Sequence, residues 1–588
     1  MSDDGLDAKY NSRRRSAKPL PELPKDDVST YDTASTKAMD AFDLPSRTST
    51  LEFDNTAQRI HLGLVTEKEM TFLDCCRKYP TAVFWSLMLS LTVVMEAYDK
   101  SLVASFLAFP AFKRAYGQTI ISPKGSLDGV EREIMSEWQI GLLNVAVITE
   151  IFGLLAHGYL TFAIGYRKVM MGSLVWLCLA IFPAFFAPNI YVLIVSQALA
   201  GIPWGVIQTL AATYAAEVVP SGLRAYVLSN INMCWVLGQL FSTGILRALI
   251  NNNTELAYRL PFGLQWVWVV LLFMIIYFAP DSPWWFIRHE RSDEARAALR
   301  RLSKRSTLDI ENTIALMEHT NNMERKLNYG GATYMDLFRG PNRRRTEIAC
   351  MVWVCQALSG AVLTSYGAYF FQQAGFDPSK SFTLSTGMYG LAIVGCMLSW
   401  ILMHKIGRRT LYIAGLAMAV VFLTVGGAFS AALRNSAVSN WTSGAMILLA
   451  TFTYDLTLGP ICYVVVAEVP STRLRVKTVA LARVSYNIIT IVNNIIVPKM
   501  LNSTDWNISG KACLVYAGTA LACLTWCIFR LPETKGLTYL ELDILFEKRA
   551  PARKFCQVQR RLADLGYPFL SAPEQQRGTS WHGWLAYS

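Results

Sequence analysis

Ala-Glu-Val-Val-Pro-Ser-Gly-Leu-Arg at residues 216–224 returns as Ala-Glu-Val-Pro-Ser-Thr-Arg-Leu-Arg at residues 467–475. A second pair matches Gly-Tyr-Arg-Lys at 165–168 with Gly-Arg-Arg at 407–409. Each stretch follows a long apolar run, and the two members of a pair lie six runs apart. This spacing predicts two parallel repeats of six membrane helices.

The apolar runs are long enough for membrane helices, which need about 20 residues each. Six runs precede a polar stretch at 280–346, and six follow it. The sequence therefore predicts an all-α membrane protein with twelve transmembrane helices in two six-helix pseudo-repeats. The runs lie at about 81–108, 138–160, 169–187, 190–214, 226–247, 261–279, 347–371, 382–403, 410–432, 443–466, 477–498 and 511–529.

The composition agrees with a membrane protein and argues against other classes. Charged residues make up 17% of the 588 residues and hydrophobic residues 53%, whereas soluble domains carry roughly 25% charge. These values also exclude a disordered chain, a collagen-like repeat and a small disulfide scaffold. The net charge of +12 does not require a nucleic-acid partner, because anionic inner-leaflet lipids attract basic residues next to spans.

The sequence lacks the motifs of catalysis, ATP hydrolysis and metal binding. It contains no GxSxG, no GxxxxGK[ST], no HExxH and no two successive CxxC pairs. We therefore expect no enzyme activity, no cofactor and no metal site.

The distribution of Lys and Arg predicts that both termini are cytoplasmic. The expected segments are a disordered tail with a short pre-membrane helix (1–80), a first half (81–279), a central loop with short helices (280–346), a second half (347–529) and a C-terminal tail (530–588). In this orientation, four Asn-x-Ser/Thr sequons lie in segments on the non-cytoplasmic side of the membrane, where glycosylation takes place. They start at Asn252, Asn440, Asn502 and Asn507.

A charge inside a predicted span costs at least about 2.5–3.5 kcal/mol at the helix centre, and four such residues are candidates for the mechanism. Glu96 and Asp99 are three residues apart in the first span and are expected to share a helix face. Glu150 lies in the second span, and Arg483 in the eleventh is the candidate counter-charge. Burial favours the neutral form of such carboxyls, which suits proton coupling. The alternative is a fixed structural ion pair with Lys100 or Arg483.

Glu and Arg recur at equivalent helix ends in both repeats. Their matched sign and position suggest ion pairs that hold the two halves together and break as the halves rock. The alternative is that they only satisfy helix ends and fix the topology. The gating candidates are Gly165, Arg167, Glu217, Arg224, Gly407, Arg408, Arg409, Glu468 and Arg473.

From about residue 66 to 546, the chain resembles the sugar-porter branch of the major facilitator superfamily. Within this branch it is similar to the fungal maltose permeases, which are α-glucoside:proton symporters. The resemblance implies a monomeric, multi-pass plasma-membrane importer whose partners are sugar, proton and lipid. It rests on Met-Glu-Ala-Tyr-Asp (95–99), Gly-Ile-Pro-Trp-Gly (201–205), Tyr-Arg-Leu-Pro-Phe (258–262), Pro-Asp-Ser-Pro-Trp-Trp (280–285), Arg-Arg-Arg-Thr-Glu-Ile (343–348) and Pro-Glu-Thr-Lys-Gly (532–536).

The resemblance also implies roles for individual residues. Acidic residues at the positions of Glu96, Asp99 and Glu150 couple proton to sugar in this family. Amides at the positions of Asn232 and Gln356 hold the sugar ring. The expected substrate-binding residues are Asn232, Trp235, Gln356, Tyr366 and Tyr463. For the aromatic residues among them, simple helix packing is the alternative.

One departure from the family pattern lies after the second span. The usual loop is Gly-x-x-x-Asp-Arg-x-Gly-x-Arg-Lys, but Phe162 and Ala163 replace its acid and base. We expect a weakened latch in this half. The departure leaves two alternatives open: a transporter-like sugar sensor with little transport, and a carrier of another sugar or polyol.

Overall fold

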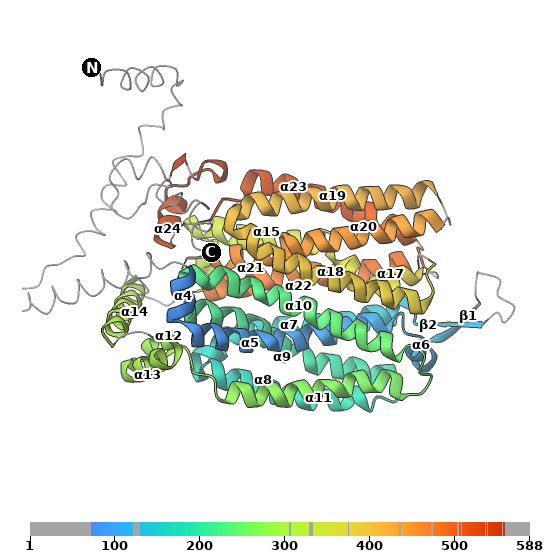
Figure 1. Ribbon diagram of the computed structural model, residues 1–588, viewed down its shortest axis with the longest axis horizontal. Coiled ribbons are helices and arrows are strands. Elements are labelled where there is room, and N and C mark those ends of the chain that lie inside the picture. The colour runs from blue at the N-terminus through green and yellow to red at the C-terminus, as the bar shows by residue number, and fades with distance from the viewer. Residues whose placement is uncertain are drawn as a thin grey trace, which may run out of the picture. The chain divides into compact units, whose positions relative to one another are not determined.

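The protein, described here from a computed structural model, is almost entirely helical (Figure 1). The structure describes residues 72–121, 130–304, 307–327, 333–373, 375–433, 437–471, 474–502, 505–506, 508–535, 537, 539–555 and 557–558. The predicted N-terminal tail lies outside these residues up to position 71. Within the described ranges, one antiparallel sheet occurs, β1 (Gln118–Ile121) with β2 (Val130–Glu133). This sheet marks one end of the helical bundle, called the hairpin end below (Figure 1).

The first half contains six long helices that match the first six predicted spans. A short helix, α4 (Phe72–Lys78), precedes them, and α6 (Pro110–Tyr116) follows the first one. The long helices are α5 (Pro80–Phe106), α7 (Ser136–Ile164), α8 (Tyr166–Phe185), α9 (Ile190–Val218), α10 (Ser221–Leu249) and α11 (Leu256–Tyr277).

The second half repeats this arrangement, but two of its spans are broken into shorter helices. The seventh span consists of α15 (Gly340–Leu358), α16 (Ala361–Ser365) and α17 (Gly367–Gln373), and the tenth of α20 (Ala437–Leu456) and α21 (Leu458–Glu468). The unbroken spans are α18 (Pro378–Lys405), α19 (Arg408–Ala432), α22 (Arg475–Leu501) and α23 (Ala512–Arg530).

Length and composition alone qualify ten described segments as membrane spans. The two further predicted spans are α10 and the broken span α15–α17. The polar residues of α10, which include Asn230 and Asn232, explain its lower hydropathy. Interrupted helices are tolerated at membrane depth where they line a cavity.

Local sequence explains where several helices start. Proline occupies the first turn of α5, α6 and α18, where its missing N–H is no loss. The Asn189 side chain accepts a hydrogen bond from the Val192 N–H at 3.1 Å and so caps the start of α9. Positive φ at Gly360 (92°) ends the first section of the seventh span.

Glycine also sets how closely α7 and α9 approach. A Cβ added at Gly205 would lie 2.2 Å from the Glu150 backbone oxygen, and one at Gly201 would lie 2.3 Å from that of Ala146. Glycines four residues apart face one side of a helix and let two backbones approach. This contact fixes the height and direction of Glu150 relative to α9.

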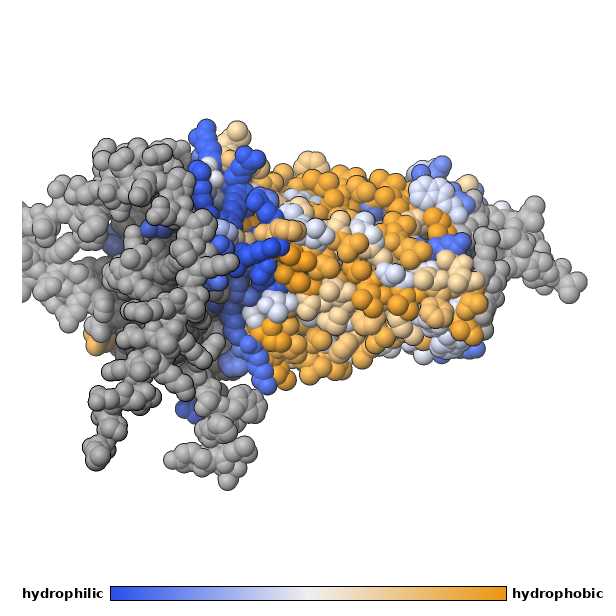
Figure 2. Space-filling model, turned by 90° about the horizontal axis from the view of Figure 1, so that it is seen from above, coloured by the Kyte–Doolittle hydropathy of each residue, from blue (hydrophilic) through white to orange (hydrophobic). Residues whose placement is uncertain are grey.

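The outer surface carries a broad apolar band between hydrophilic ends (Figure 2). Large apolar side chains of α8 and α11, which lie on the opposite face in Figure 1, are also exposed, among them Leu179, Val267 and Met274. Such a continuous exposed apolar surface fits contact with lipid.

The segment between the halves forms helices at the end of the bundle opposite the hairpin, called the connector end (Figure 1). They are α12 (Pro283–Arg288), α13 (Ser292–Leu302) and α14 (Thr307–Leu327). Ile287, Leu299 and Ile314 form part of their own small core. Near the end of the described residues, the chain forms the helix α24 (Tyr539–Glu547).

The four sequons differ in accessibility. Asn252 is exposed, whereas Asn502 is fully buried and donates a hydrogen bond to Ser136 Oγ at 3.0 Å. A glycan on Asn502 is incompatible with this packing. Asn440 is half-buried, and Asn507 lies outside the described residues.

Candidate transport site

A central cavity of about 170 Å³ lies between the two halves. Its walls come from α5, α7, α9 and α10 of the first half and from α15, α16, α18, α20, α21 and α22 of the second. Spans that are distant in sequence thus contribute to one polar site. The lining includes seven side chains singled out from the sequence: Glu150, Asn232, Trp235, Gln356, Tyr366, Tyr463 and Arg483.

A network of charges lies on the first-half wall. Lys100 Nζ is 2.8 Å from Glu96 Oε1 and 2.6 Å from Glu150 Oε2. Both carboxylates are fully buried, while the Lys100 side chain retains 22% exposure. Lys100 therefore joins α5 to α7, as the fixed-pair alternative foresaw.

The same network continues into the second half through Gln208 on α9. Gln208 Nε2 donates to Glu96 Oε1 at 2.8 Å, and Gln208 Oε1 accepts a hydrogen bond from Arg483 Nε. The Arg483 guanidinium lies 4.2 Å from the ring centre of Tyr486 and 4.4 Å from that of Trp353. These cation–π contacts stabilise a buried cation. Arg483 is thus linked to the carboxylates through an amide.

Asp99 lies outside this network. Its Oδ1 accepts a hydrogen bond from Gln265 Nε2 of α11 at 2.7 Å, and the residue does not line the cavity. Residues three apart on a helix differ by about 60° in direction. Glu96 and Asp99 therefore point to nearby parts of the α5 surface, but their partners differ: Glu96 binds Lys100 and Gln208, whereas Asp99 binds Gln265.

The expected sugar-binding residues have distinct surroundings. Asn232 Nδ2 donates to Asp455 Oδ1 at 2.9 Å, and Tyr366 OH donates to Asn494 Oδ1 at 3.1 Å. Tyr463 packs edge-on against Trp353, with ring centres 5.0 Å apart.

Two of these side chains keep unused polar atoms. Within the described part of the chain, Gln356 Oε1 and Trp235 Nε1 are buried and have no hydrogen-bond partner. Buried polar atoms are normally satisfied. An acceptor and a donor are therefore available at the cavity wall.

Sequence reasoning missed part of the lining. Asp455 on α20 and three residues of α22, Asn487, Asn493 and Asn494, also face the cavity. Asp455 carried the same signal as Glu96, a charge inside an apolar run. The asparagines recur at helical spacing in an otherwise apolar span, which marks a polar helix face.

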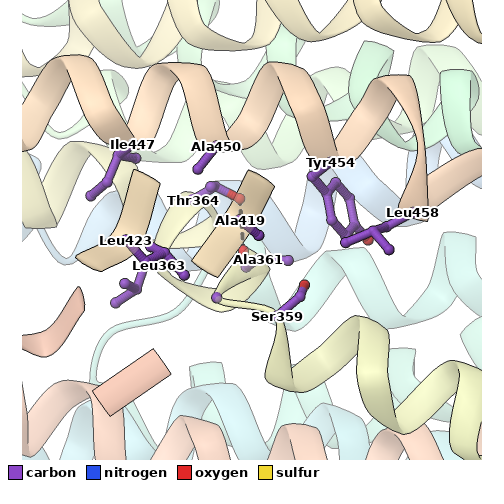
Figure 3. Close-up of a pocket in the computed structure, with 11 residues that line it drawn as sticks. Ser359, Ala361, Leu363, Thr364, Ala419, Leu423, Ile447, Ala450, Tyr454 and Leu458 are labelled. Carbon is purple, nitrogen blue, oxygen red and sulfur yellow. Dashed lines mark hydrogen bonds between the residues drawn. The ribbon is translucent and has the colours of Figure 1, made fainter. Parts of the chain in front are cut away.

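A small crevice of about 10 Å³ lies behind the break at Gly360 (Figure 3). Ala361, Thr364, Leu423 and Tyr454 are among the residues that line it, from α16, α19 and α20. This volume holds about one water molecule at most.

At the connector end, the first-half latch residues bind the start of the connector. The Arg167 N–H donates to Asp281 Oδ1 at 2.9 Å, just after Gly165. Glu217 accepts a hydrogen bond from Ser282 Oγ at 2.5 Å and pairs with Arg288 Nη1 at 2.8 Å.

The second half reproduces this pattern. The N–H groups of Arg408 and Arg409 donate to Glu533 at 2.8 and 3.2 Å, just after Gly407. Glu468 accepts a hydrogen bond from Thr534 Oγ1 at 2.6 Å and lies 3.6 Å from Arg408 Nη2.

One of the repeated arginines interacts with a residue of the other half. Arg224 of α10 interacts electrostatically with Glu468 of α21. The short contacts of the repeated glutamates are thus with Ser282 and Arg288 of the connector for Glu217, and with Arg408 and Thr534 for Glu468. Arg473 lies outside the described residues.

The departure at Phe162 gives an apolar contact in place of a charge pair. Phe162 is 58% exposed, and its ring lies 5.1 Å from that of His289 in the connector. Its backbone oxygen accepts a hydrogen bond from Trp285 Nε1 at 2.9 Å. Ala163 is exposed.

Residues 85–546 match the family model described as "Sugar (and other) transporter". The chain belongs to the sugar transporter family. It is 40% identical over 495 residues to a general alpha-glucoside permease of Saccharomyces cerevisiae, covering 83% of this chain and 79% of that one. A maltose permease of the same yeast is 38% identical over 498 residues, covering 83% and 80%. The expectation of a transporter, not an enzyme, is confirmed by this family.

Solved structures establish the fold of this sugar transporter. It resembles the proton:xylose symporter XylE bound to 6-bromo-6-deoxy-D-glucose, with TM-score 0.66, 19% identity and coverage of 80% of this chain and 100% of that one. It also resembles a partially occluded inward-open XylE from E. coli, with TM-score 0.60, 18% identity and coverage of 78% and 99%. The predicted fold, that of the major facilitator superfamily, is confirmed.

Proposed function

We propose that this sugar transporter imports α-glucosides such as maltose together with protons, by alternating access. The yeast relatives named for α-glucosides and maltose support the substrate class. The observation that carries the proposal is the cavity between the halves, where buried carboxyls and amides converge. Amides bind sugar hydroxyls, and carboxyls carry protons.

We further propose that the transporter is a monomer in the plasma membrane with both termini in the cytoplasm. The excess of Lys and Arg at the connector end supports this orientation. In it, the connector end faces the cytoplasm and the hairpin end faces outside.

Contacts between the halves at both ends support an occluded state. At the hairpin end, Tyr369 OH donates to Glu133 Oε1 at 3.0 Å. At the connector end, Tyr226 OH lies 3.3 Å from His404 Nδ1. The cavity of about 170 Å³ is smaller than the roughly 300–1,000 Å³ of typical ligand pockets. The halves therefore need to part before a disaccharide enters.

The charge network offers a route for coupling. Lys100 bridges two carboxylates, so protonation of Glu150 would remove one of its two partners. Loss of that ion pair would loosen α7 from α5, next to the contact of α7 with α22. In this mechanism, protonation from outside and sugar binding together permit the inward switch.

Uptake of radiolabelled maltose in cells without their own α-glucoside transporters tests the proposal. We expect accumulation and alkalinisation of a weakly buffered medium. Glu150→Gln should lower alkalinisation, while Glu137→Gln, an exposed carboxyl in the first turn of the same helix, should leave it intact. Intact alkalinisation in Glu150→Gln at normal surface levels would falsify coupling through Glu150. Sugar binding without accumulation would favour the sensor.

A further inference from the structure

Asp455 is a buried carboxyl that connects the two halves at the cavity. It is 4% exposed, lies near the end of α20 and lines the cavity. Its Oδ1 accepts from Asn232 Nδ2 of α10 at 2.9 Å and from the Cys396 thiol of α18 at 3.8 Å. Asn232 belongs to the first half and Asp455 to the second, so this hydrogen bond crosses the interface.

The local backbone holds the pair in place. Thr457, between α20 and α21, has φ −129° and ψ −73°, which ends one helix directly after Asp455. A Cβ added at Gly459 would lie 2.6 Å from Asn232 Oδ1. The Asn232 amide therefore lies directly against the α21 backbone, and its donor group is aimed at Asp455.

The charges around the cavity leave Asp455 without a counter-ion. Lys100 and Arg483 offset Glu96 and Glu150 in the network described above. Throughout the described ranges, no ion pair to Asp455 is found. A buried carboxylate without a cation is costly, which favours the neutral, protonated acid when the cavity is closed.

The remaining neighbours do not change this balance. The titratable groups that face Asp455 are the Cys396 thiol and the phenols of Tyr389 and Tyr454. All three are neutral at physiological pH by their ordinary chemistry. The neighbour on α10 is the amide of Asn232.

We propose that Asp455 is a second proton-carrying carboxyl, in the half opposite to Glu96 and Glu150. This inference rests on the proposed symport. Asp455 takes up a proton from the outer medium while the cavity is open to it, and stays neutral in the occluded state. When the halves part on the inner side, Asn232 separates from Asp455 and water ionises the acid. One proton crosses, and no other bond changes.

The test uses the purified full chain in liposomes with radiolabelled maltose. Maltose exchange at equal concentrations needs no net proton movement, whereas accumulation driven by a pH gradient does. For a gradient of one pH unit, each coupled proton raises the accumulation limit by about tenfold. Asp455→Asn keeps a partner for Asn232 but cannot ionise. We expect preserved exchange whose decline at alkaline pH is weaker, because only Glu150 still has to be protonated, together with one proton fewer per maltose and an accumulation limit about tenfold lower.

Two further variants separate titration from structure. Asp455→Glu keeps the carboxyl and should retain both the pH dependence and the accumulation. Cys396→Ser changes the other neighbour and should alter neither. If Asp455→Asn fails to fold, Asp455→Ser removes the carboxyl with a smaller polar side chain and should lower accumulation in the same way.

Several results would overturn the proposal. One is an unchanged proton-to-maltose ratio in Asp455→Asn. Another is exchange whose pH dependence matches the original chain. A third is accumulation in Asp455→Ser that matches the original chain. If the original chain exchanges maltose but moves no protons, the proposed symport fails, and the pH profile of exchange in Asp455→Asn still decides the role of Asp455.

Discussion

Replacing Gly407 by alanine should detach the start of α19 from the segment that follows α23. A Cβ at this position would lie 2.0 Å from Glu533 Oε2 and 2.6 Å from its carboxyl carbon. The φ of Gly407 is −69°, which alanine adopts without strain. The effect therefore comes from displacement of the carboxylate and not from the backbone.

The magnitude follows from the bonds that the displaced carboxylate loses. Glu533 accepts from the Arg408 and Arg409 N–H groups at 2.8 and 3.2 Å. A hydrogen bond to a charged group contributes about 1.5–3 kcal/mol, so losing both costs roughly 3–6 kcal/mol at most. The thermal stability of the purified protein should fall, and maltose uptake should fall with it.

A double-mutant cycle isolates the cause. Gly407→Ala and Glu533→Ala remove the same two hydrogen bonds, so their combination should cost little more than either alone. Shortening the acid should relieve the clash, since Asp281 makes the equivalent contact in the first half, 3.3 Å from a Cβ added at Gly165. Gly407→Ala with Glu533→Asp should therefore regain stability. Additive costs, or unchanged melting of Gly407→Ala, would refute the reasoning.

Three other predictions follow from the site. Lys100→Met leaves two buried carboxylates unpaired and should cost about 3–5 kcal/mol. Adding Glu150→Gln removes one of these charges and should regain part of that cost; equal melting of the single and double variants would contradict this. Phe162→Asp should raise maltose uptake if the altered loop limits gating, and unchanged uptake would count against that expectation. Burial raises the pKa of Asp281 above its ordinary value despite the nearby Arg167. The native state then holds a proton at pH values where the unfolded chain has lost it, so this group's contribution to stability falls as pH rises through that window. Asp281→Asn should flatten this pH dependence in thermal melts, and an unchanged profile would rule out Asp281 as its source.

The course of the chain through the membrane could be predicted well from the sequence. Apolar runs of about 20 residues and the repeated stretches at 216–224 and 467–475 located the spans and the two halves. The physical reason is that lipid requires continuous apolar helices. The break at Gly360 was missed, because its cause, a positive φ beside a cavity, is a tertiary feature.

The candidate site could be predicted only in part. Seven chosen side chains line the cavity, since polar groups in a span usually face the protein interior. The roles proposed for them stay predictions. Asp455 was missed because the candidate carboxyls were sought in the first half, although Asp455 is likewise a charge inside an apolar run.

By itself, the sequence determined the order of the helices, the family and the set of charges at membrane depth. The tertiary structure decided which charges meet. Glu96 and Asp99, three residues apart, bind Lys100 of their own helix and Gln265 of α11, respectively. Glu217 and Glu468, equivalent in sequence, pair with Arg288 and Arg408. The reason is geometric: periodicity gives the direction of a side chain relative to its own helix, while its partner depends on which helices pack there, through contacts hundreds of residues apart.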